Sequence, residues 1–105
     1  MRWKVRRPAR IDLDLCDLVD YLARSSPKNA LRFLDSFDKT LEWLVASPER
    51  GAFWDTPKLA RSGIRVWPVR HFKKILIFYR IEGVKILLMR ILHGARDLET
   101  ELGTR

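Results

Sequence analysis

The chain has one cysteine among its 105 residues, and this scarcity limits its covalent and metal chemistry. A single thiol, Cys16, can form neither an internal disulfide bond nor a cysteine-based zinc site. The two histidines, His71 and His93, cluster neither with each other nor with Cys16 in the sequence. We therefore expect no metal site and no cofactor, and we interpret Cys16 as a small apolar residue of the core.

The chain also lacks an uninterrupted apolar run long enough to cross a bilayer. The longest candidate, residues 75–92, contains four charged residues. The basic first ten residues are followed by no apolar run, so they do not resemble a secretory signal. Because apolar residues still make up 47% of the chain, we expect one packed domain over residues 1–105, with no membrane association.

Acidic residues are scarce in the second half of the chain. Residues 58–96 hold ten basic side chains against one acid, Glu82, and the first ten residues hold five bases and no acid. Residues 11–57 have the opposite balance, with nine acids and five bases, and the whole chain carries a net charge of +8. Two basic segments around an acidic one give the surface a polarised electrostatic field, which favours a polyanion or an acidic protein as the partner.

Apolar spacing predicts two helices in the first half of the chain. In residues 11–22 and 27–45 the apolar side chains recur at helical intervals, and Pro8 and Ser26 provide start signals. Only a few residues separate the two segments, so we expect them to pair as an antiparallel hairpin. In the first helix the aspartates predict an acidic outer face: Asp12, Asp14, Asp17 and Asp20.

The remainder of the chain has the two-residue alternation and the isoleucine-rich and aromatic composition of strands. We expect strands at residues 3–6, 64–69, 75–81 and 84–92, a long loop at 47–63 and a short helix from about 95 to 102. The predicted fold is an α+β domain in the order β-α-α-β-β-β-α. Its antiparallel sheet is packed by the N-terminal helical hairpin.

Alternation along the strands also predicts which side chains share a face of the sheet. We assign one set to the core under the helices: Ile77, Tyr79, Ile81, Leu87, Met89 and Ile91. We assign the other set to the second face, with Arg65 nearby: Leu76, Phe78, Arg80, Ile86, Leu88 and Arg90. If only the hairpin covers the sheet, this second face is exposed and marks a partner surface. The alternative is that the loop or the C-terminal segment covers it.

Three stretches of the second half resemble one protein family. They are the basic strand GIRVWPV, the hairpin IFYRIEG and the ending RILHGARDLE. Together with the order of elements, they resemble the RelE/ParE superfamily of toxins from bacterial type II toxin–antitoxin modules, over essentially the whole chain. The ending HGARD is most similar to the ParE-like branch.

The resemblance implies a cytoplasmic, growth-inhibiting toxin of a plasmid-stabilisation module, neutralised by a cognate antitoxin and able to enter a higher-order toxin–antitoxin complex. ParE-like members act on DNA gyrase and have no known hydrolytic chemistry, so we expect gyrase inhibition rather than enzyme activity. One alternative is metal-independent cleavage of messenger RNA on the ribosome, as in RelE-like members. The other alternative is a non-toxic relative that only binds a partner.

RNA cleavage would place the chemistry on Arg96 and His93, which match the region after the last strand. The late tyrosine of RelE-like members falls near Leu102, which cannot transfer a proton. Both residues also have a purely structural interpretation. His93 can hydrogen-bond to the backbone at the end of a strand, and Arg96 can pair with a nearby carboxylate.

For contact with a target or an antitoxin we single out basic and apolar side chains of the second face and its surroundings. They are Arg65, Arg70, Lys73, Lys74, Phe78, Arg80, Leu88, Arg90 and Arg96. A charge-rich strand face can also serve solubility alone, but the basic excess of this half of the chain favours a partner.

Overall fold

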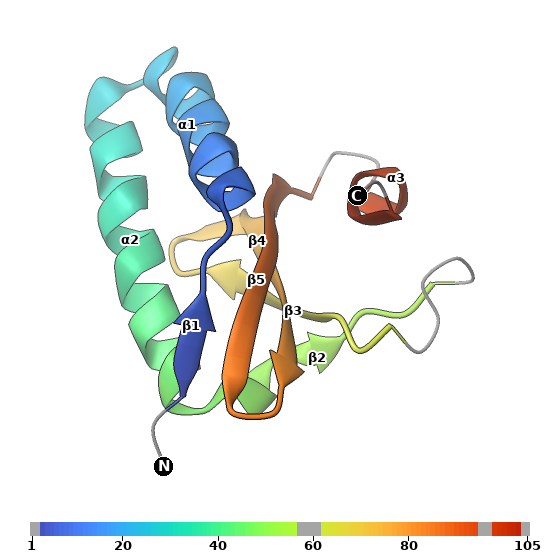
Figure 1. Ribbon diagram of the computed structural model, residues 1–105. Helices are drawn as coiled ribbons and strands as arrows, with labels where there is room; N and C mark the ends of the chain where they lie inside the picture. The colour runs from blue at the N-terminus through green and yellow to red at the C-terminus, as the bar shows by residue number, and fades with distance from the viewer. Residues whose placement is uncertain (1–2, 57–61, 95–97, 104–105) are drawn as a thin grey trace.

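A computed structural model gives the fold and describes residues 3–56, 62–94 and 98–103. The elements follow the chain as β1 (Lys4–Arg6), α1 (Ala9–Ala23), α2 (Pro27–Ala46), the 3₁₀ helix η1 (Pro48–Arg50), β2 (Ala52–Phe53), β3 (Arg65–Val69), β4 (Phe72–Glu82), β5 (Lys85–His93) and α3 (Leu98–Gly103). The predicted α+β class and helical hairpin are confirmed (Figure 1). Among the described segments, no helix is both long and apolar enough to span a membrane.

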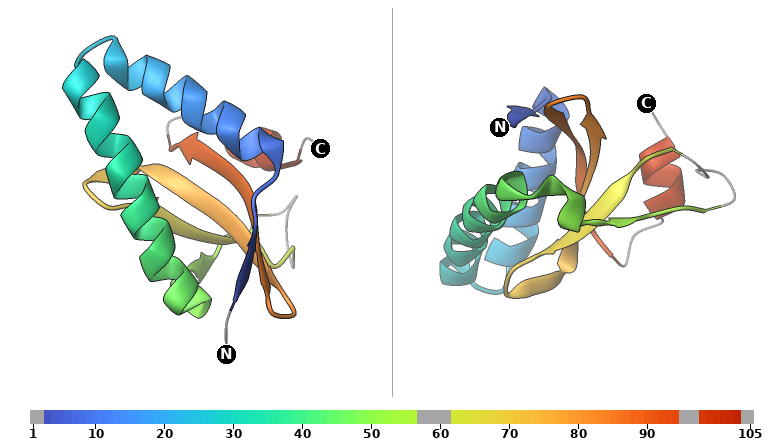
Figure 2. Two further views of the ribbon diagram at one scale, coloured as in Figure 1. Left: turned by 60° about the vertical axis from the view of Figure 1, so that its left-hand side comes forward. Right: turned by 90° about the horizontal axis from the view of Figure 1, so that it is seen from below.

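The helical hairpin begins and turns where the local sequence favours it. Pro8 precedes α1, and Ser26 caps α2 by accepting a hydrogen bond at its Oγ from the backbone N–H of Asn29, at 3.1 Å. Pro27, at the first position of α2, has no N–H to leave unpaired there. Both helices lie on one face of the sheet, as Figure 2 shows. Their buried apolar side chains belong to the same core cluster as those of that sheet face.

The sheet has five strands in the order β1-β5-β4-β3-β2, and it is mixed rather than antiparallel. Strand β1 pairs in parallel with β5 through Lys4–Lys85 to Arg6–Leu87, whereas the other pairs are antiparallel. The expectation of an antiparallel sheet was wrong for this pair, because side-chain alternation is the same for either strand direction. The short strand β2 lies in the segment expected to be a loop.

Helices cover both faces of the sheet, so the predicted open second face is wrong. On the face opposite the hairpin, α3 contributes the side chain of Leu102. Trp54, directly after β2, and Ile64, directly before β3, contribute two more apolar side chains. These side chains enclose Phe78 and Leu92, and Figure 2 shows α3 across the sheet from α1 and α2. The alternative, in which the chain covers its own second face, is the one observed.

A bulge in β5 explains why two of the six predicted core assignments, Leu87 and Met89, were wrong. Phe78 pairs with Arg90, but the next residue, Tyr79, pairs with Leu88, so Met89 is an extra residue on β5. The bulge reverses the alternation towards the start of β5. Ile86 and Leu88 therefore lie in the core under the helices, where Leu87 and Met89 were expected.

The assignments for β4 and for the end of β5 were correct, since Ile77, Tyr79 and Ile91 are buried under the hairpin. Cys16 was expected in the core, but its side chain is exposed on α1. Its neighbours in the apolar stripe, Leu15 and Leu18, are buried instead. Cys16 thus falls just outside the part of the helix that contacts the sheet.

Candidate functional site

A buried ion pair joins α1 to β5 beside the end of the sheet. The carboxylate of Asp14 accepts hydrogen bonds from Nε of Arg90 at 2.8 Å and from its Nη2 at 3.0 Å. Asp14 is 3% exposed and Arg90 is 8% exposed, so both charges are removed from solvent. The hydrogen bond to Asp14 raises the pKa of Arg90, and burial opposes this effect less strongly.

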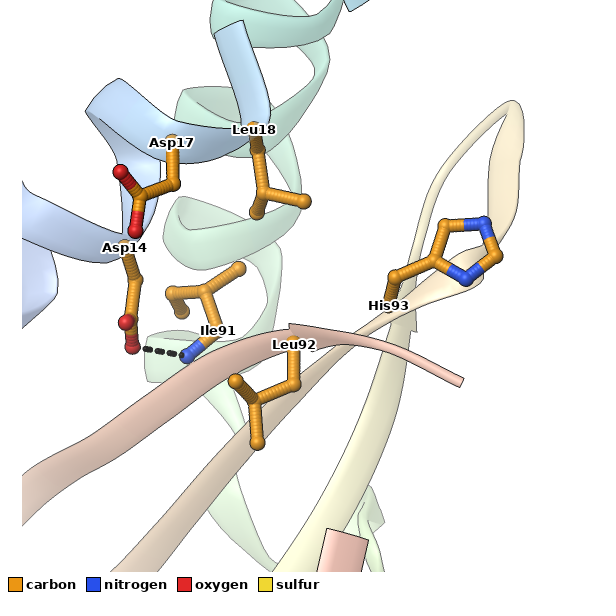
Figure 3. A pocket seen from close by; sticks show the side chains of 6 residues that line it. All are labelled: Asp14, Asp17, Leu18, Ile91, Leu92 and His93. Carbon is orange, nitrogen blue, oxygen red and sulfur yellow. Dashed lines mark hydrogen bonds between the residues drawn. The ribbon is translucent and has the colours of Figure 1, made fainter. Parts of the chain in front are cut away.

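The same carboxylate also completes the edge of the sheet. Strand β1 pairs only with Lys85 to Leu87, so the later part of β5 has no neighbouring strand on that side. There the backbone N–H of Ile91 donates to Oδ2 of Asp14 at 3.0 Å (Figure 3). Asp14 therefore satisfies a backbone donor that would otherwise be buried without a partner.

Arg90 extends this network to the helix on the other face. Its Nη1 lies 3.2 Å from the carbonyl oxygen of Glu101 and 3.1 Å from the carboxylate of the same residue. Arg90 thus links α1, β5 and α3, and its guanidinium is occupied inside the protein. Its side chain is therefore buried rather than presented to a partner in this structure, and Asp14 is buried rather than on the expected acidic outer face.

The sequence carried a signal for Asp14 that the prediction missed. Asp14 stands three residues after Ile11 and four before Leu18, and both of these side chains are buried. A carboxylate at these helical intervals lies on the apolar stripe. A buried aspartate needs a cationic partner. Arg90 is 76 residues away in the sequence, so only the fold identifies it as that partner.

His93 lies at the end of β5 and contacts the ring of Tyr21 on α1. The ring centroids are 5.9 Å apart in an edge-to-face arrangement. A cavity of about 10 Å³ beside it is lined by Asp14, Asp17 and His93, and Figure 3 shows the imidazole directed away from both carboxylates. A volume of this size holds at most one water molecule, so it does not admit a nucleotide.

Three of the predicted contact residues gather at the turn between β3 and β4. Arg70, Lys73 and Lys74 are all exposed there. The turn is fixed to α2 because Oγ1 of Thr40 accepts from the N–H of Arg70 at 3.0 Å and donates to the carbonyl of Ser36 at 2.7 Å. We call Arg70, Lys73 and Lys74 the basic turn. Within the described parts of the chain, none of its three cations has a carboxylate partner.

Arg65 and Arg80 lie on opposite faces of the sheet, although the prediction placed them together. Arg65 pairs across the strands with Tyr79, whose side chain faces the hairpin, and cross-strand neighbours share a face. Arg80, next to Tyr79 on β4, faces the other way and forms an ion pair with Glu82. The two arginines therefore do not form one surface.

Two of the remaining predicted contact residues, Phe78 and Leu88, are buried in this structure. Phe78 and Leu88 are 0% exposed, the first under Trp54 and the second under the helices. Arg96 lies outside the described residues. Within the described ranges, no group of three or more histidine, cysteine, aspartate or glutamate side chains could hold a metal ion.

Comparison with known proteins identifies relatives over most of the chain. A sequence model of the family described as "ParE toxin of type II toxin-antitoxin system, parDE" matches residues 5–98. A solved structure described as "Chromosomal ParDE TA system from P. aeruginosa" aligns with a TM-score of 0.65 at 22% identity. The alignment covers 89% of this chain and 95% of that one, and at this identity it shows a shared fold. No curated protein sequence matches significantly.

Proposed function

The chain belongs to the family of ParE toxins of type II toxin–antitoxin systems, and on that premise we propose that it inhibits DNA gyrase and is neutralised by a cognate antitoxin protein. The family match over residues 5–98 is the observation that carries this proposal. It includes the helical hairpin, strands β2 to β5 and all but the first residue of β1, so it does not depend on one short motif. We further propose that the protein acts in the cytoplasm as a growth inhibitor and plasmid-stabilising factor.

The basic turn supports a macromolecular target. Arg70 and Lys73–Lys74 project from the end of a β-hairpin that Thr40 fixes to α2, so the cations are presented from a rigid base. Exposed cations with no carboxylate partner are free to contact an acidic protein surface or a nucleic acid. We propose that the basic turn contacts the complex of gyrase with DNA.

The environment of the candidate proton-transfer groups favours gyrase inhibition over RNA cleavage. The phenol of Tyr79 is buried, donates to the carbonyl of Pro48 at 2.6 Å and accepts from the N–H of Gly51 at 2.9 Å. Leu102, on α3, is buried and carries no transferable proton, and the ring of His93 is partly exposed and packs edge-to-face against Tyr21. A metal-independent RNase needs both an accessible acid and an accessible base, and of these three positions only His93 is partly exposed.

Two reactions separate the proposed activities. Purified protein added to gyrase and relaxed plasmid should block supercoiling or trap cleaved DNA. Translating ribosomes treated with the same protein should give no new primer-extension stops. Cleavage of messenger RNA on ribosomes, together with normal supercoiling, would overturn the gyrase proposal in favour of the RelE-like activity.

A charge-matched pair of variants tests the basic turn. Lys73→Gln with Lys74→Gln removes two exposed cations from the turn, and Arg24→Gln with Lys28→Gln removes two from the hairpin loop region. We expect the first variant to need about tenfold more protein for half-inhibition of gyrase and the second to match wild type. Equal losses in both variants would mean that overall charge, rather than the basic turn, is recognised.

A further inference from the structure

Arginines and aromatic rings alternate on the surface where α2, η1, β2 and β3 meet. The guanidinium carbon of Arg50 lies 3.7 Å from the ring centroid of Trp43, and that of Arg65 lies 4.1 Å from the ring centroid of Phe53. The rings of Trp43 and Trp67 pack with centroids 4.9 Å apart. We call these five residues, Trp43, Arg50, Phe53, Arg65 and Trp67, the arginine–aromatic patch.

Hydrogen bonds to backbone carbonyls fix both guanidiniums of the patch. Nη1 of Arg50 donates to the carbonyl of Trp43 at 3.3 Å. Nη1 of Arg65 donates to the carbonyl oxygens of Glu49 and Gly51, at 3.1 and 2.9 Å. The side chains are therefore held in place before any partner arrives, which lowers the entropy that binding would cost.

Tyr79 fixes the segment from Pro48 to Gly51 through hydrogen bonds of its buried hydroxyl. Its hydroxyl bridges Pro48 and Gly51, and a β-carbon added at Gly51 would lie 2.1 Å from that oxygen. The φ of Gly51, −66°, is one that any residue can adopt, so the backbone conformation does not require glycine. Glycine is required because the tyrosine hydroxyl lies where a β-carbon would be. The turn that carries Arg50 and leads into Phe53 is thus fixed from both sides.

The patch is exposed and has the composition of a binding hot spot. Trp43 is 44% exposed and Phe53 is 59% exposed, which is costly for rings of this size unless they serve a contact. Over the described ranges, neither Arg50 nor Arg65 forms an ion pair with a carboxylate. Tryptophan and arginine are the residues most often found at the centre of protein interfaces.

We propose that the arginine–aromatic patch binds an acidic segment of the antitoxin that also carries an apolar side chain; this inference rests on the proposed function. The carboxylates of that segment pair with Arg50 and Arg65, and its apolar side chain packs against the exposed edges of Trp43 and Phe53. The net charge of +8 favours an acidic partner in the same way.

The covered ring faces argue against a nucleic acid in this place. Bases bind aromatic side chains by stacking on a free face. Here Arg50 lies over the ring of Trp43, Trp67 packs against the same ring, and Arg65 lies over that of Phe53. The ring of Trp43 therefore contacts both Arg50 and Trp67, which leaves less of its faces for a base to stack on.

The patch is also separate from the basic turn. Arg65 is the first residue of β3, and Arg70 follows the last residue of that strand. The basic turn offers cations without aromatic anchors, whereas the patch offers anchors that slow dissociation, as stable neutralisation requires. We therefore assign the target to the first surface and the antitoxin to the second.

The test measures affinity for the protein encoded by the adjacent reading frame, by titration calorimetry. Arg50→Gln with Phe53→Ser should raise the dissociation constant about 30-fold or more. A matched control, Arg24→Gln with Leu31→Ser, removes one exposed cation and one exposed apolar side chain from the helical hairpin and should stay within twofold of wild type. Circular dichroism verifies that both variants are folded, and growth inhibition without the antitoxin should be unchanged for both.

Each other outcome contradicts the inference in a recognisable way. Unchanged affinity of the patch variant, with wild-type binding intact, would overturn this assignment and leave the proposed function standing. Lost toxicity with unchanged affinity would assign the patch to the target instead. Equal losses in the control would indicate unspecific charge attraction. If the wild-type protein does not bind the adjacent gene product, the proposed function fails and this inference fails with it.

Discussion

At the scale of single residues, Asp14 and Arg90 show how a buried charge pair can organise a small domain. Asp14 bonds to Arg90 and to the N–H of Ile91, and Arg90 continues to Glu101 on α3. A carboxylate that satisfies both a cation and the edge of a sheet has two roles that one substitution removes together.

We predict that Asp14→Ala lowers the free energy of unfolding by about 3 kcal/mol or more, because it leaves the guanidinium of Arg90 buried without its main partner. Urea denaturation measures this loss. Replacing both partners, with Asp14→Leu and Arg90→Met, should cost less than Asp14→Ala alone, since no buried guanidinium is left without its carboxylate and the N–H of Ile91 loses its partner in both variants. If the double replacement costs as much as the sum of its single replacements, the pair is not coupled.

Tyr79 is the second residue whose contribution can be isolated. Burial raises the pKa of its phenol above the ordinary 10.0, and this effect exceeds those of the hydrogen bond from Gly51 and the charge of Arg65, which lower it. As the pH rises through about 10, the unfolded chain therefore loses this proton before the folded one. The stability that Tyr79 contributes is complete below pH 10 and declines above it.

We predict that Tyr79→Phe costs about 1–3 kcal/mol at pH 7, because the carbonyl of Pro48 and the N–H of Gly51 lose their partner. The difference in unfolding free energy between wild type and this variant should narrow between pH 9 and 11. Urea denaturation across that range measures it. Tyr21→Phe, at an exposed position, serves as the control, and a difference that stays constant with pH would refute the role given to the buried phenol.

At the scale of elements, α3 is the covering layer of the second sheet face. It has six residues, too few to be stable as an isolated helix, and it depends on Leu98 and Leu102 packing on the sheet. The salt bridge and hydrogen bond from Arg90 to Glu101 add a second attachment. The cover is therefore held by few contacts.

We predict that Leu102→Ser releases α3 and exposes the apolar cluster around Phe78 and Leu92. The variant should bind the dye ANS, exchange its α3 amide protons faster and lose about 2 kcal/mol of stability. Leu13→Ser, at an exposed position on α1, should show none of these changes. Unchanged dye binding in the Leu102 variant would mean that α3 does not protect this face.

The helices and four of the five strands, all except β2, were predictable because each has a local pattern. Apolar spacing and the Ser26–Pro27 start signal define α2, and the glycine turn at Gly83 (φ 63°) separates β4 from β5. The direction of β1, the bulge at Met89 and the burial of Asp14 were not predictable in this way. Each of these three features depends on which segments, distant in the sequence, pair or pack in the fold. Side-chain alternation within one strand carries no information about those partners.

The candidate site was predicted less well than the fold, for the same reason. Phe78 and Leu88 are apolar strand residues, and the sequence could not show that α3 or the reversed register would bury them. The basic turn was found because charge alone identifies it. The arginine–aromatic patch was missed because Trp43, Arg50 and Phe53 approach Arg65 and Trp67 only through the fold.

At the scale of the whole molecule, the fold separates the basic turn from the arginine–aromatic patch. The basic turn lies after the end of β3, and the arginine–aromatic patch includes its first residue. A partner bound at one surface leaves the side chains of the other in place. We therefore propose that the antitoxin inhibits by occupying a surface of its own and extending towards the basic turn.

One titration tests this account most directly. Gyrase and relaxed plasmid are mixed with a fixed, inhibitory concentration of the protein, and the product of the adjacent reading frame is added in steps while supercoiling is measured on gels. The account predicts full inhibition without the antitoxin and full recovery once the two proteins are near equimolar. Normal supercoiling in the absence of antitoxin, at every concentration of the folded protein, would contradict it.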